Sequence, residues 1–461
     1  MMTTQHARVG IFIDRDGVLN HEVKHPELVD AQGRACSDVL TPEEFVLFDG
    51  VQEAFEKIKK SGALSLIVSN QVGFAKGFVN QEMLNAIRQK MVDLLHPDGV
   101  YYCLHHEDYT GSCDCKKPKK GLLLQAAKEH NVDITKSYMI GDRRIDMQTG
   151  SDCKRCFLVN SREGENVFDE WAKLDFVLRS KVTVVQSFAE AIDIILQDLR
   201  GELDAVFEAI IPCAGRGTRM GELTDEIPKA MISFDGIPFL QFIMQHLVQN
   251  GIRRFIIPVG YLGHCIKEYF GDGSKFGVEI VYAQSSVEVE TGGSFKRALP
   301  YVQGNSFLMY YGDSYYPYDL SSITQHFVDS KKTMMFVCQQ RPKVEGFEDK
   351  SNLVVDESLN VLAYDKKNTS GNATMHDVGV LYFTRDIIKY CEPDIFILDQ
   401  HVTPLLAHNT LVCAYLSANK SIGMGNPQKI ERFKKYLEEH KDVFPKVKRM
   451  GRESDCVHKH L

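Results

Sequence analysis

Short apolar runs alternate with longer amphipathic stretches through the first part of the chain. Each apolar run has the length and composition of a buried strand, and in the amphipathic stretches apolar residues recur with the period of a helix. We expect strands at 9–14, 64–70, 99–104 and 137–142, and helices at 51–62, 81–95 and 122–130. Strands alternating with helices are typical of a doubly wound parallel sheet. The pattern fades over residues 155–173.

A second alternating series follows an amphipathic segment at 186–204 and opens with a strand at 205–215. It continues with a helix at 239–251 and with strands at 255–260, 278–284, 306–313, 333–340 and 378–383. No Pro- or Ser-rich linker marks the junction, which we place within 198–206. The end of the chain, 429–461, is typical of a helix followed by a basic tail. We therefore predict domains at 1–200 and 206–435, and a C-terminal helix and tail at 436–461.

Bulk properties narrow the function classes. A chain of 461 residues is too long for one ordinary core and accommodates two or three domains. Its net charge of −8 argues against a nucleic-acid or membrane binder, which needs excess Lys and Arg on one face. The N-terminus lacks signal-peptide features and no apolar run approaches about 18 residues, so we expect a cytoplasmic protein. The 12 Cys residues form no disulfide-scaffold pattern.

The first candidate site begins with Asp14 and Asp16, two residues apart at the end of a predicted buried strand. Both carboxylates reach the sheet edge where α/β proteins bind ligands, so one can attack phosphorus while the other moves the proton. The alternative for an isolated motif of this kind is a simple Asp-Gly turn.

Further polar residues favour chemistry over a turn, because they follow the later strands of the same predicted sheet. Ser69 and Asn70 offer polar ligands for a phosphate, and Lys117 offers a cation to balance it. The run MIGDRRID ends another strand with carboxylates suited to Mg²⁺, which prefers oxygen ligands. That run supplies Asp142, Arg143 and Asp146.

This ordered set resembles the haloacid dehalogenase-like phosphatases over about residues 8–198. The resemblance implies a Rossmann-like parallel sheet, with Asp14 as the nucleophile that becomes an aspartyl phosphate and Asp16 as general acid and then base. It further implies Mg²⁺ between Asp14, the Asp16 carbonyl and Asp142, with Asp146 supporting the metal from outside. Lys117 would hold the phosphoryl group, and Arg143 is expected among the substrate-binding residues.

A cluster of sulfur and nitrogen ligands narrows the resemblance. Three thiols and one imidazole within thirteen residues predict a closed structural zinc site, formed by Cys103, His105, Cys113 and Cys115. His106 is an adjacent substitute for the imidazole, and a reduced, partly exposed loop is the alternative to metal binding. With DRDGVLN, VSNQVGFAKG and CDCKKPKKGLL, the cluster resembles D-glycero-D-manno-heptose 1,7-bisphosphate 7-phosphatases, whose nearest relatives are histidinol phosphatases.

One position departs from that family. The residue before the phosphate-binding lysine is usually Arg in the heptose enzymes, where it helps to recognise the substrate, and here it is Lys116. Lysine keeps the charge but lacks the bidentate geometry of a guanidinium, so the reaction type is better defined than the substrate. Lys116 is still expected to contact the substrate.

The second candidate site lies in AIIPCAGRGTRMGELTDEIPKAM, where a strand runs into a Gly-rich loop. The glycines let backbone N–H groups approach a triphosphate, and the cations Arg219 and Lys229 neutralise charge on the phosphates. The motif resembles sugar-1-phosphate nucleotidyltransferases over about residues 205–435, which implies a mixed, Rossmann-like sheet and Mg²⁺ bound by Asp313. By the same resemblance, the substrate-binding residues are Gly215, Gly217, Thr218, Glu290, Gly292, Gly293 and Asp377, with 290–299 as the sugar-binding loop.

Two departures affect this second resemblance. Most relatives begin the loop with two glycines, where this chain has Ala214 and Gly215. The segment IGMGNP aligns with one that often carries a second metal-binding Asp, and that position is Gly423 here. Either another acid completes the metal site, or the domain is slow or binds without turnover.

The leading hypothesis is a bifunctional enzyme that removes the C7 phosphate of heptose 1,7-bisphosphate and then transfers a nucleotide to heptose 1-phosphate. The second domain most resembles heptose 1-phosphate guanylyltransferases, so GTP is the favoured donor and GDP-heptose the expected product. The expected partners are a phosphorylated sugar and a nucleoside triphosphate. We expect binding neither to nucleic acid nor to a membrane, and the sequence leaves open whether the protein forms a homo-oligomer. One alternative keeps both chemistries with another sugar. Another makes the C-terminal half a regulatory module that binds a nucleotide or sugar phosphate.

Overall fold

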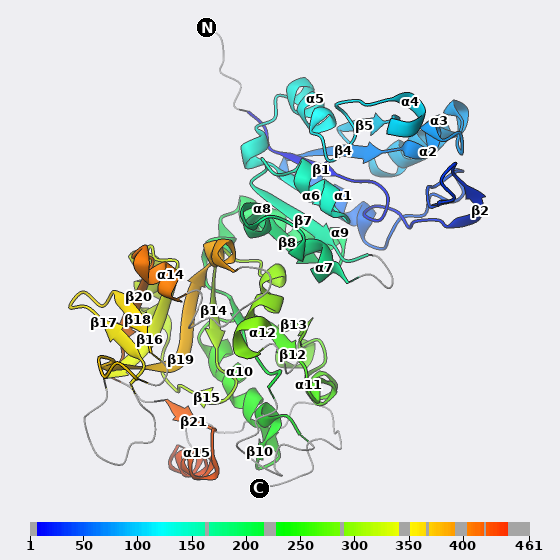
Figure 1. The fold of residues 1–461 in the computed structure, drawn as a ribbon. Coiled ribbons are helices and arrows are strands. Elements are labelled where there is room, and N and C mark those ends of the chain that lie inside the picture. The colour runs from blue at the N-terminus through cyan, green and yellow to red at the C-terminus, as the bar shows by residue number, and fades with distance from the viewer. Residues whose placement is uncertain are drawn as a thin grey trace. The chain divides into compact units, whose positions relative to one another are not determined.

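The computed structural model describes residues 7–161, 166–215, 227–285, 290–340, 351–365, 368–391, 403–418 and 421–440. The chain divides into two compact units, 1–202 and 203–461. Among the described helices, none is long and apolar enough to cross a membrane. Each unit is built on its own α/β sheet (Figure 1).

The N-terminal unit contains a six-stranded parallel sheet in the order β5-β4-β1-β6-β7-β8. A separate antiparallel hairpin is formed by β2 and β3. The strands are β1 Gly10–Ile13, β2 His25–Val29, β3 Ala35–Cys36, β4 Leu64–Asn70, β5 Gly99–Cys103, β6 Tyr138–Gly141, β7 Arg155–Val159 and β8 Val182–Val185. The helices are α1 Val51–Ser61, α2 Val72–Ala75, α3 Gln81–Leu95, α4 Glu107–Thr110, α5 Gly121–His130, α6 Arg144–Thr149, α7 Val167–Ala172, α8 Phe176–Lys181 and α9 Phe188–Leu199.

The order of this sheet fixes where a ligand can bind. From β1 the chain moves to β4 and β5 on one side, and later to β6, β7 and β8 on the other. Neighbouring connections therefore leave in opposite directions between β1 and β6. A crevice opens at the carboxyl ends of strands at such a switch point, and the residues after β1 and β6 line it.

The expectation that the strand pattern fades over residues 155–173 was wrong, because β7 occupies Arg155–Val159 and pairs with β6. Its five residues are all buried, including Arg155. The run is too short to show a period. A strand covered on both faces is usually apolar throughout, and the arginine in this run therefore made a buried strand difficult to recognise. The strand β8, Val182–Val185, was also missed for its shortness.

The second unit contains a mixed sheet in the order β13-β12-β9-β14-β19-β16-β20, with β17 and β18 attached through β19. Its strands are β9 Glu208–Ile210, β10 Ser233–Phe234, β11 Ile237–Pro238, β12 Arg254–Val259, β13 Glu279–Gln284, β14 Ser306–Tyr310, β15 Ser314–Tyr315, β16 Met334–Gln340, β17 Leu353–Val355, β18 Val361–Tyr364, β19 Met375–Thr384, β20 Val412–Leu416 and β21 Ile422–Gly423. Its helices are α10 Phe239–Gln249, α11 Gly263–Phe270, α12 Glu290–Ala298, α13 Ser321–Ser330, α14 Thr403–His408 and α15 Pro427–Glu439.

The helix α15 crosses the boundary predicted at residues 435 and 436. Its apolar face buries Ile430 and Phe433, and Phe433 packs edge-on against the aromatic rings of Phe234, Phe239 and Phe242. The helix is thus part of the core of the second unit. Sequence alone shows the amphipathic period of this helix but not the surface that covers it.

Candidate active sites

Asp14 lies at the point where β1 ends, inside the crevice of the N-terminal unit. The four residues of β1 are fully buried between β4 and β6, and the Asp14 N–H continues the ladder by donating to the Ile140 carbonyl at 2.9 Å. Its Oδ1 accepts the Arg15 N–H at 2.8 Å. A paired backbone on a buried strand fixes the direction of the carboxylate, and Asp14 lines the cavity described below.

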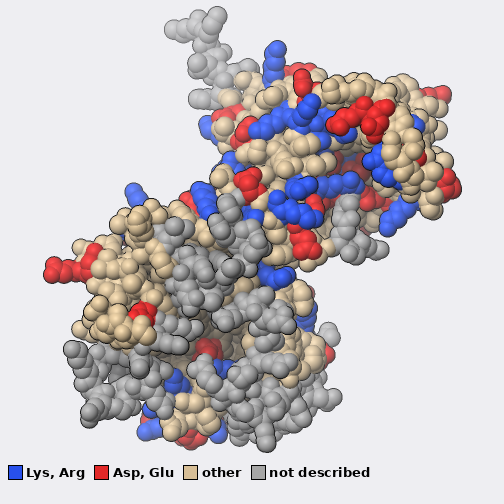
Figure 2. All heavy atoms as spheres, in the orientation of Figure 1, with Lys and Arg blue, Asp and Glu red and all other residues tan. Residues whose placement is uncertain are grey.

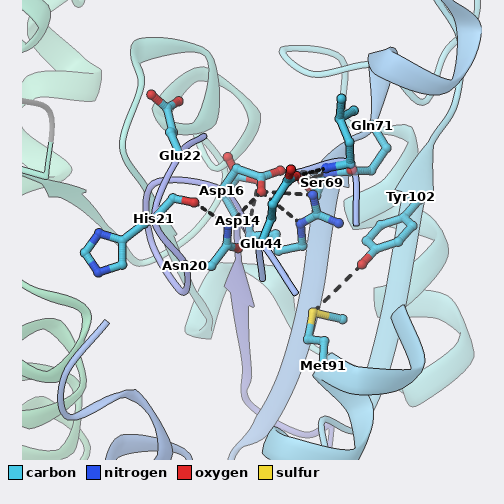
Figure 3. Close-up of polar contacts among 12 residues, drawn as sticks. Asp14, Asp16, Asn20, His21, Glu22, Glu44, Ser69, Gln71, Met91 and Tyr102 are labelled. Atoms are coloured by element: carbon cyan, nitrogen blue, oxygen red, sulfur yellow. Dashed lines mark hydrogen bonds and ion pairs between the residues drawn. The ribbon is translucent and has the colours of Figure 1, made fainter. Parts of the chain in front are cut away.

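Asp16 is held by three neighbours (Figure 3). The Arg15 guanidinium donates to Oδ1 through Nε at 3.0 Å and Nη2 at 2.9 Å. Asn20 donates to the same oxygen at 3.0 Å, and Gln71 donates to Oδ2 at 2.8 Å. Burial acts to raise the pKa of Asp16, but the Arg15 charge and these hydrogen bonds outweigh it and the pKa is lowered. This carboxyl is therefore ionised in the ligand-free protein.

Lys117 connects two of the acids. Its Nζ lies 2.8 Å from Asp14 Oδ1 and 2.6 Å from Asp146 Oδ1. Asn70 fixes the lysine backbone, since Asn70 Oδ1 accepts the Lys117 N–H at 3.0 Å and Asn70 Nδ2 donates to its carbonyl at 3.3 Å. Burial acts to lower the pKa of Lys117, but the two carboxylates raise it overall, so the ammonium stays charged. Asn70 thus acts through the position of Lys117.

Three carboxylates form a candidate cation site. Oxygen atoms of Asp14, Asp142 and Asp146 lie within 4.8 Å of one another. Burial raises the pKa of Asp146 to about 6 against the opposing charge of Lys117. The Asp146 carboxylate also accepts the Arg143 N–H at 3.1 Å, so it is engaged by protein groups on two sides. This set of carboxylate oxygens has the chemistry that a hard divalent cation prefers.

Gly17 makes the approach of Asp142 possible. Its φ is +77°, and a Cβ atom there would lie 2.5 Å from Asp142 Oδ2. Only glycine adopts that backbone at low cost and leaves room for the carboxylate. The Gly in the Asp-Arg-Asp-Gly motif is therefore required both by the turn and by the neighbouring acid.

A cavity of about 270 Å³ opens beside Asp14. The predicted residues Ser69, Asn70, Lys116 and Arg143 line it together with Asp14 and Asp16. Sequence reasoning missed Glu22, Asp38, Lys76 and His106, which also line the cavity. These residues lie in irregular segments, two of them at the ends of the short helices α2 and α4, where no period marks an inward side chain. Figure 2 shows basic and acidic side chains gathered together on the drawn face of this unit.

The four predicted zinc ligands lie together. Cys115 Sγ is 3.2 Å from Cys103 Sγ, 3.4 Å from Cys113 Sγ and 3.3 Å from His105 Nδ1. Cys103 Sγ is 3.7 Å from Cys113 Sγ and 3.8 Å from His105 Nδ1. A tetrahedron with Zn–S bonds of about 2.3 Å has edges of about 3.8 Å, so this donor set fits zinc with slight expansion. His106 instead caps α4, where its Nδ1 accepts the Asp108 N–H at 3.2 Å.

In the second unit the structure brings together Lys229 and Asp313. The Lys229 Nζ lies 2.7 Å from Asp313 Oδ2, and Asp313 follows β14 at the carboxyl edge of the sheet. Gly215 follows β9, the neighbouring parallel strand, so both segments meet at a switch point of the second sheet. Gly217, Thr218 and Arg219 lie outside the described residues, as does the side chain of Glu290.

The segment expected to be the sugar-binding loop is helical. Gly292 and Gly293 lie in the first turn of α12, Glu290–Ala298. The first N–H groups of a helix have no partner within it, so glycines there cost little, and the residues after them favour a helix. Asp377 is 6% exposed, and its Oδ1 accepts the Gly379 N–H at 2.7 Å. This hydrogen bond lies within β19, at the point where Gly379 has φ +84°.

Gly423 lies beside Asp313 on the paired strands β15 and β21. Ser314 pairs with Gly423, and the Met424 N–H donates to the Asp313 carbonyl at 2.7 Å. A Cβ atom at Gly423 would lie 3.6 Å from Lys429 Nζ. A lysine ammonium thus occupies the neighbourhood in which the sequence comparison expected a second acid.

Comparisons with known proteins match both halves of the chain. Residues 208–394 match the family described as Nucleotidyl transferase. The D-glycero-beta-D-manno-heptose-1,7-bisphosphate 7-phosphatase of Haemophilus influenzae is 36% identical over 185 residues, which are 37% of this chain and 92% of that protein. The protein of the same description from Pasteurella multocida is 35% identical over 183 residues, with 37% and 91% covered. The solved structure of HddC from Yersinia pseudotuberculosis is similar at a TM-score of 0.43 and 21% identity, covering 50% of this chain and all of that one.

Proposed function

The N-terminal part of this chain belongs to the D-glycero-beta-D-manno-heptose-1,7-bisphosphate 7-phosphatase family, and on that premise we propose a bifunctional enzyme of nucleotide-activated heptose synthesis. The first site removes the C7 phosphate of heptose 1,7-bisphosphate. The second, in the nucleotidyltransferase domain, joins heptose 1-phosphate to a nucleoside monophosphate taken from GTP, which gives GDP-heptose and pyrophosphate. The two reactions are sequential because the phosphate group that remains at C1 of the sugar after the first reaction is the nucleophile of the second.

The phosphatase step uses Asp14 and Asp16. An Asp14 carboxylate oxygen attacks phosphorus, the bond between phosphorus and the C7 oxygen breaks, and that oxygen takes a proton from Asp16. In the second half, Asp16 removes a proton from water, whose oxygen attacks the aspartyl phosphate and releases inorganic phosphate and the Asp14 carboxylate. The observation that carries the proposal is the Lys117 ammonium against Asp14, because it offers a fixed cation where phosphoryl charge must be held.

Arg15 favours the base form of Asp16, because its guanidinium lowers the pKa of that carboxyl. The acid form required in the first half must therefore arise when substrate binds. A phosphate dianion placed beside Asp16 raises the pKa of the carboxyl by like-charge repulsion. Departure of the sugar removes part of that charge and favours the base form needed for hydrolysis.

Metals complete the proposal at both sites. Asp14, Asp142 and the Asp16 carbonyl would hold Mg²⁺, which supplies charge neutralisation for the phosphoryl oxygens. The thiols of Cys103, Cys113 and Cys115 with His105 would hold a zinc ion. Such an ion would be structural, because protein donors fill all four coordination positions and no position is left for a substrate. Asp313 is the proposed Mg²⁺ ligand of the transferase, and the Lys229 ammonium already balances its charge.

In the transferase step the phosphate oxygen of heptose 1-phosphate attacks the α-phosphorus of the nucleotide, and pyrophosphate leaves. Catalysis requires positioning and charge stabilisation by Lys229 and Arg219, without a protein nucleophile. The guanine preference is supported by the resemblance of the second domain to heptose 1-phosphate guanylyltransferases and by its pairing with a heptose-type phosphatase. The Lys429 ammonium near Gly423 favours a second candidate, a regulatory module that binds the nucleotide without turnover.

The test uses the purified full chain with heptose 1,7-bisphosphate, Mg²⁺ and each nucleoside triphosphate in turn. Phosphate, pyrophosphate and nucleotide sugar are followed by mass. We expect GDP-heptose with one equivalent each of phosphate and pyrophosphate. Phosphate without nucleotide sugar would refute the transferase proposal and leave the regulatory module. Absence of phosphate release would refute the heptose substrate.

A further inference from the structure

The hairpin of β2 and β3 forms part of the cavity wall although it lies outside the parallel sheet. His25 pairs with Cys36 and Val29 with Ala35, and the chain then continues into Asp38. The wall segment, Ala35 to Asp38, consists of β3 and the two residues after it, and all four residues line the cavity. The other wall carries Asp14, Asp16 and Ser69, so a ligand that reaches the catalytic acids also meets this segment.

Contacts on two sides hold the hairpin in place. Asp30, in its turn, lies 3.0 Å from the Nζ of Lys76, which follows α2. Asp30 is 7% exposed and also accepts the Arg34 side chain at 2.8 Å. The Ala31 N–H donates to the Tyr109 hydroxyl of α4 at 3.1 Å. Because a buried charge pair is costly to separate, the hairpin is fixed against α2.

Asp38 has no evident structural role. No residue that the structure describes gives its carboxylate a hydrogen bond or an ion pair, and the half-buried side chain lines the cavity. Burial and the charge of Asp16 raise the pKa of Asp38. The backbone of Gly73 in α2 faces it so closely that a Cβ atom there would lie 2.5 Å from Asp38 Oδ2. Because the side chain is only partly buried and lines the cavity, its oxygens are open to a ligand that supplies a hydrogen-bond donor.

The chemistry of the surrounding wall identifies that donor. Lys76, Lys116 and Arg143 line the same cavity and attract phosphate groups. A carboxylate repels phosphate and accepts hydrogen bonds from hydroxyl groups. We propose that Asp38 is a specificity-determining residue of the phosphatase, whose carboxylate accepts hydrogen bonds from the hydroxyl groups of a phosphorylated sugar. This inference rests on the proposed phosphatase function and adds the group that reads the sugar chain.

The test compares two kinds of substrate in the full-length protein. One substrate is a sugar bisphosphate, either heptose 1,7-bisphosphate or fructose 1,6-bisphosphate, whichever the wild-type protein hydrolyses with the higher kcat/KM. The other is p-nitrophenyl phosphate, whose aryl group carries no hydroxyl group. We expect Asp38→Ala to lower kcat/KM for the sugar by on the order of 10- to 100-fold, the effect of losing a hydrogen bond to a charged group, and to leave the aryl ester unchanged. Asp38→Asn keeps one acceptor and should lose less.

Two further variants test the position of the Asp38 carboxylate and the effect of removing an unrelated acid. Gly73→Ala keeps Asp38 but displaces it, and the φ of Gly73 is not positive, so the same selective loss is expected. Asp193→Asn removes an exposed acid of α9 that lies outside the cavity and should change neither activity. If Asp38→Ala loses the same activity with both substrates, or loses no activity with either, the role of Asp38 is refuted while the proposed phosphatase function stands. A wild-type protein that prefers the aryl ester to both sugars would overturn the proposed function and this inference together.

Discussion

Gly17→Ala tests whether the turn after Asp14 positions Asp142. The substitution adds one methyl group to a residue with φ +77°, at a point 2.5 Å from Asp142 Oδ2. Gly62→Ala is a matched control in the same unit, since Gly62 has φ +79° and its added Cβ would meet no atom within 4 Å. The two variants share the backbone strain and differ in the contact with the acid.

The expected magnitudes follow from this geometry. An alanine in the left-handed region costs about 1–2 kcal/mol, so both variants should lose that much free energy of unfolding. In Gly17→Ala, relief of the contact moves the Asp142 carboxylate by roughly 0.5–1 Å, since carbon atoms normally stay more than about 3 Å from an oxygen. A displacement of that size in a catalytic group costs on the order of 100-fold in rate.

The assay measures phosphate release from the sugar bisphosphate, nucleotidyl transfer and unfolding in urea for both variants. We expect Gly17→Ala to lose on the order of 100-fold in phosphatase kcat/KM while transfer is unchanged. Gly62→Ala should keep both activities. If Gly17→Ala keeps the phosphatase activity of Gly62→Ala, the contact with Asp142 does not position a functional carboxylate and the reasoning is refuted.

Three further outcomes are expected. Asp14→Asn should abolish phosphate release but keep nucleotidyl transfer, and Asp313→Ala the reverse; loss of both activities from either change would refute the two-site proposal. Purified protein should contain about one zinc equivalent per chain, and elemental analysis of Cys115→Ser should find less than half of that; equal zinc in both would exclude the thiol cluster as its ligand set. Burial lowers the pKa of His246 from 6.5 to about 4, so the free energy of unfolding should fall by up to about 3 kcal/mol as the pH falls from about 6.5 to 4. His246→Gln should reduce this dependence when the free energy of unfolding in urea is measured against pH. Identical pH dependence in the two proteins would contradict this.

The phosphatase site shows why strand ends are informative in a sequence. Asp14 and Asp142 both follow short, fully apolar runs, and parallel strands align their carboxyl ends at one edge of the sheet. The proximity of the two acids therefore follows from local pattern and sheet rules. The thiol cluster was accessible for a related reason, because its four members lie within one short segment.

Other features depended on neighbours that are distant in sequence. The Gly-rich start of α12 was interpreted as a loop, because the packing that stabilises the helix comes from other strands. Asp377 was predicted to contact sugar hydroxyls; the structure adds that its carboxylate accepts the Gly379 N–H within β19, a contact that the sequence pattern does not show. Asp38 gave no signal, because only the fold places it in the cavity wall beside Gly73 of α2.

By itself, the sequence determined two successive α/β units, the polar residues at their strand ends and the group of four soft metal ligands, because each rests on local periodicity or close spacing. Tertiary structure decided which charges face one another. The Lys117 contact with Asp14 and the hydrogen bond from Gln71 to Asp16 join segments far apart in the chain. Such contacts set pKa values and substrate fit through distance and burial, which a linear pattern does not contain.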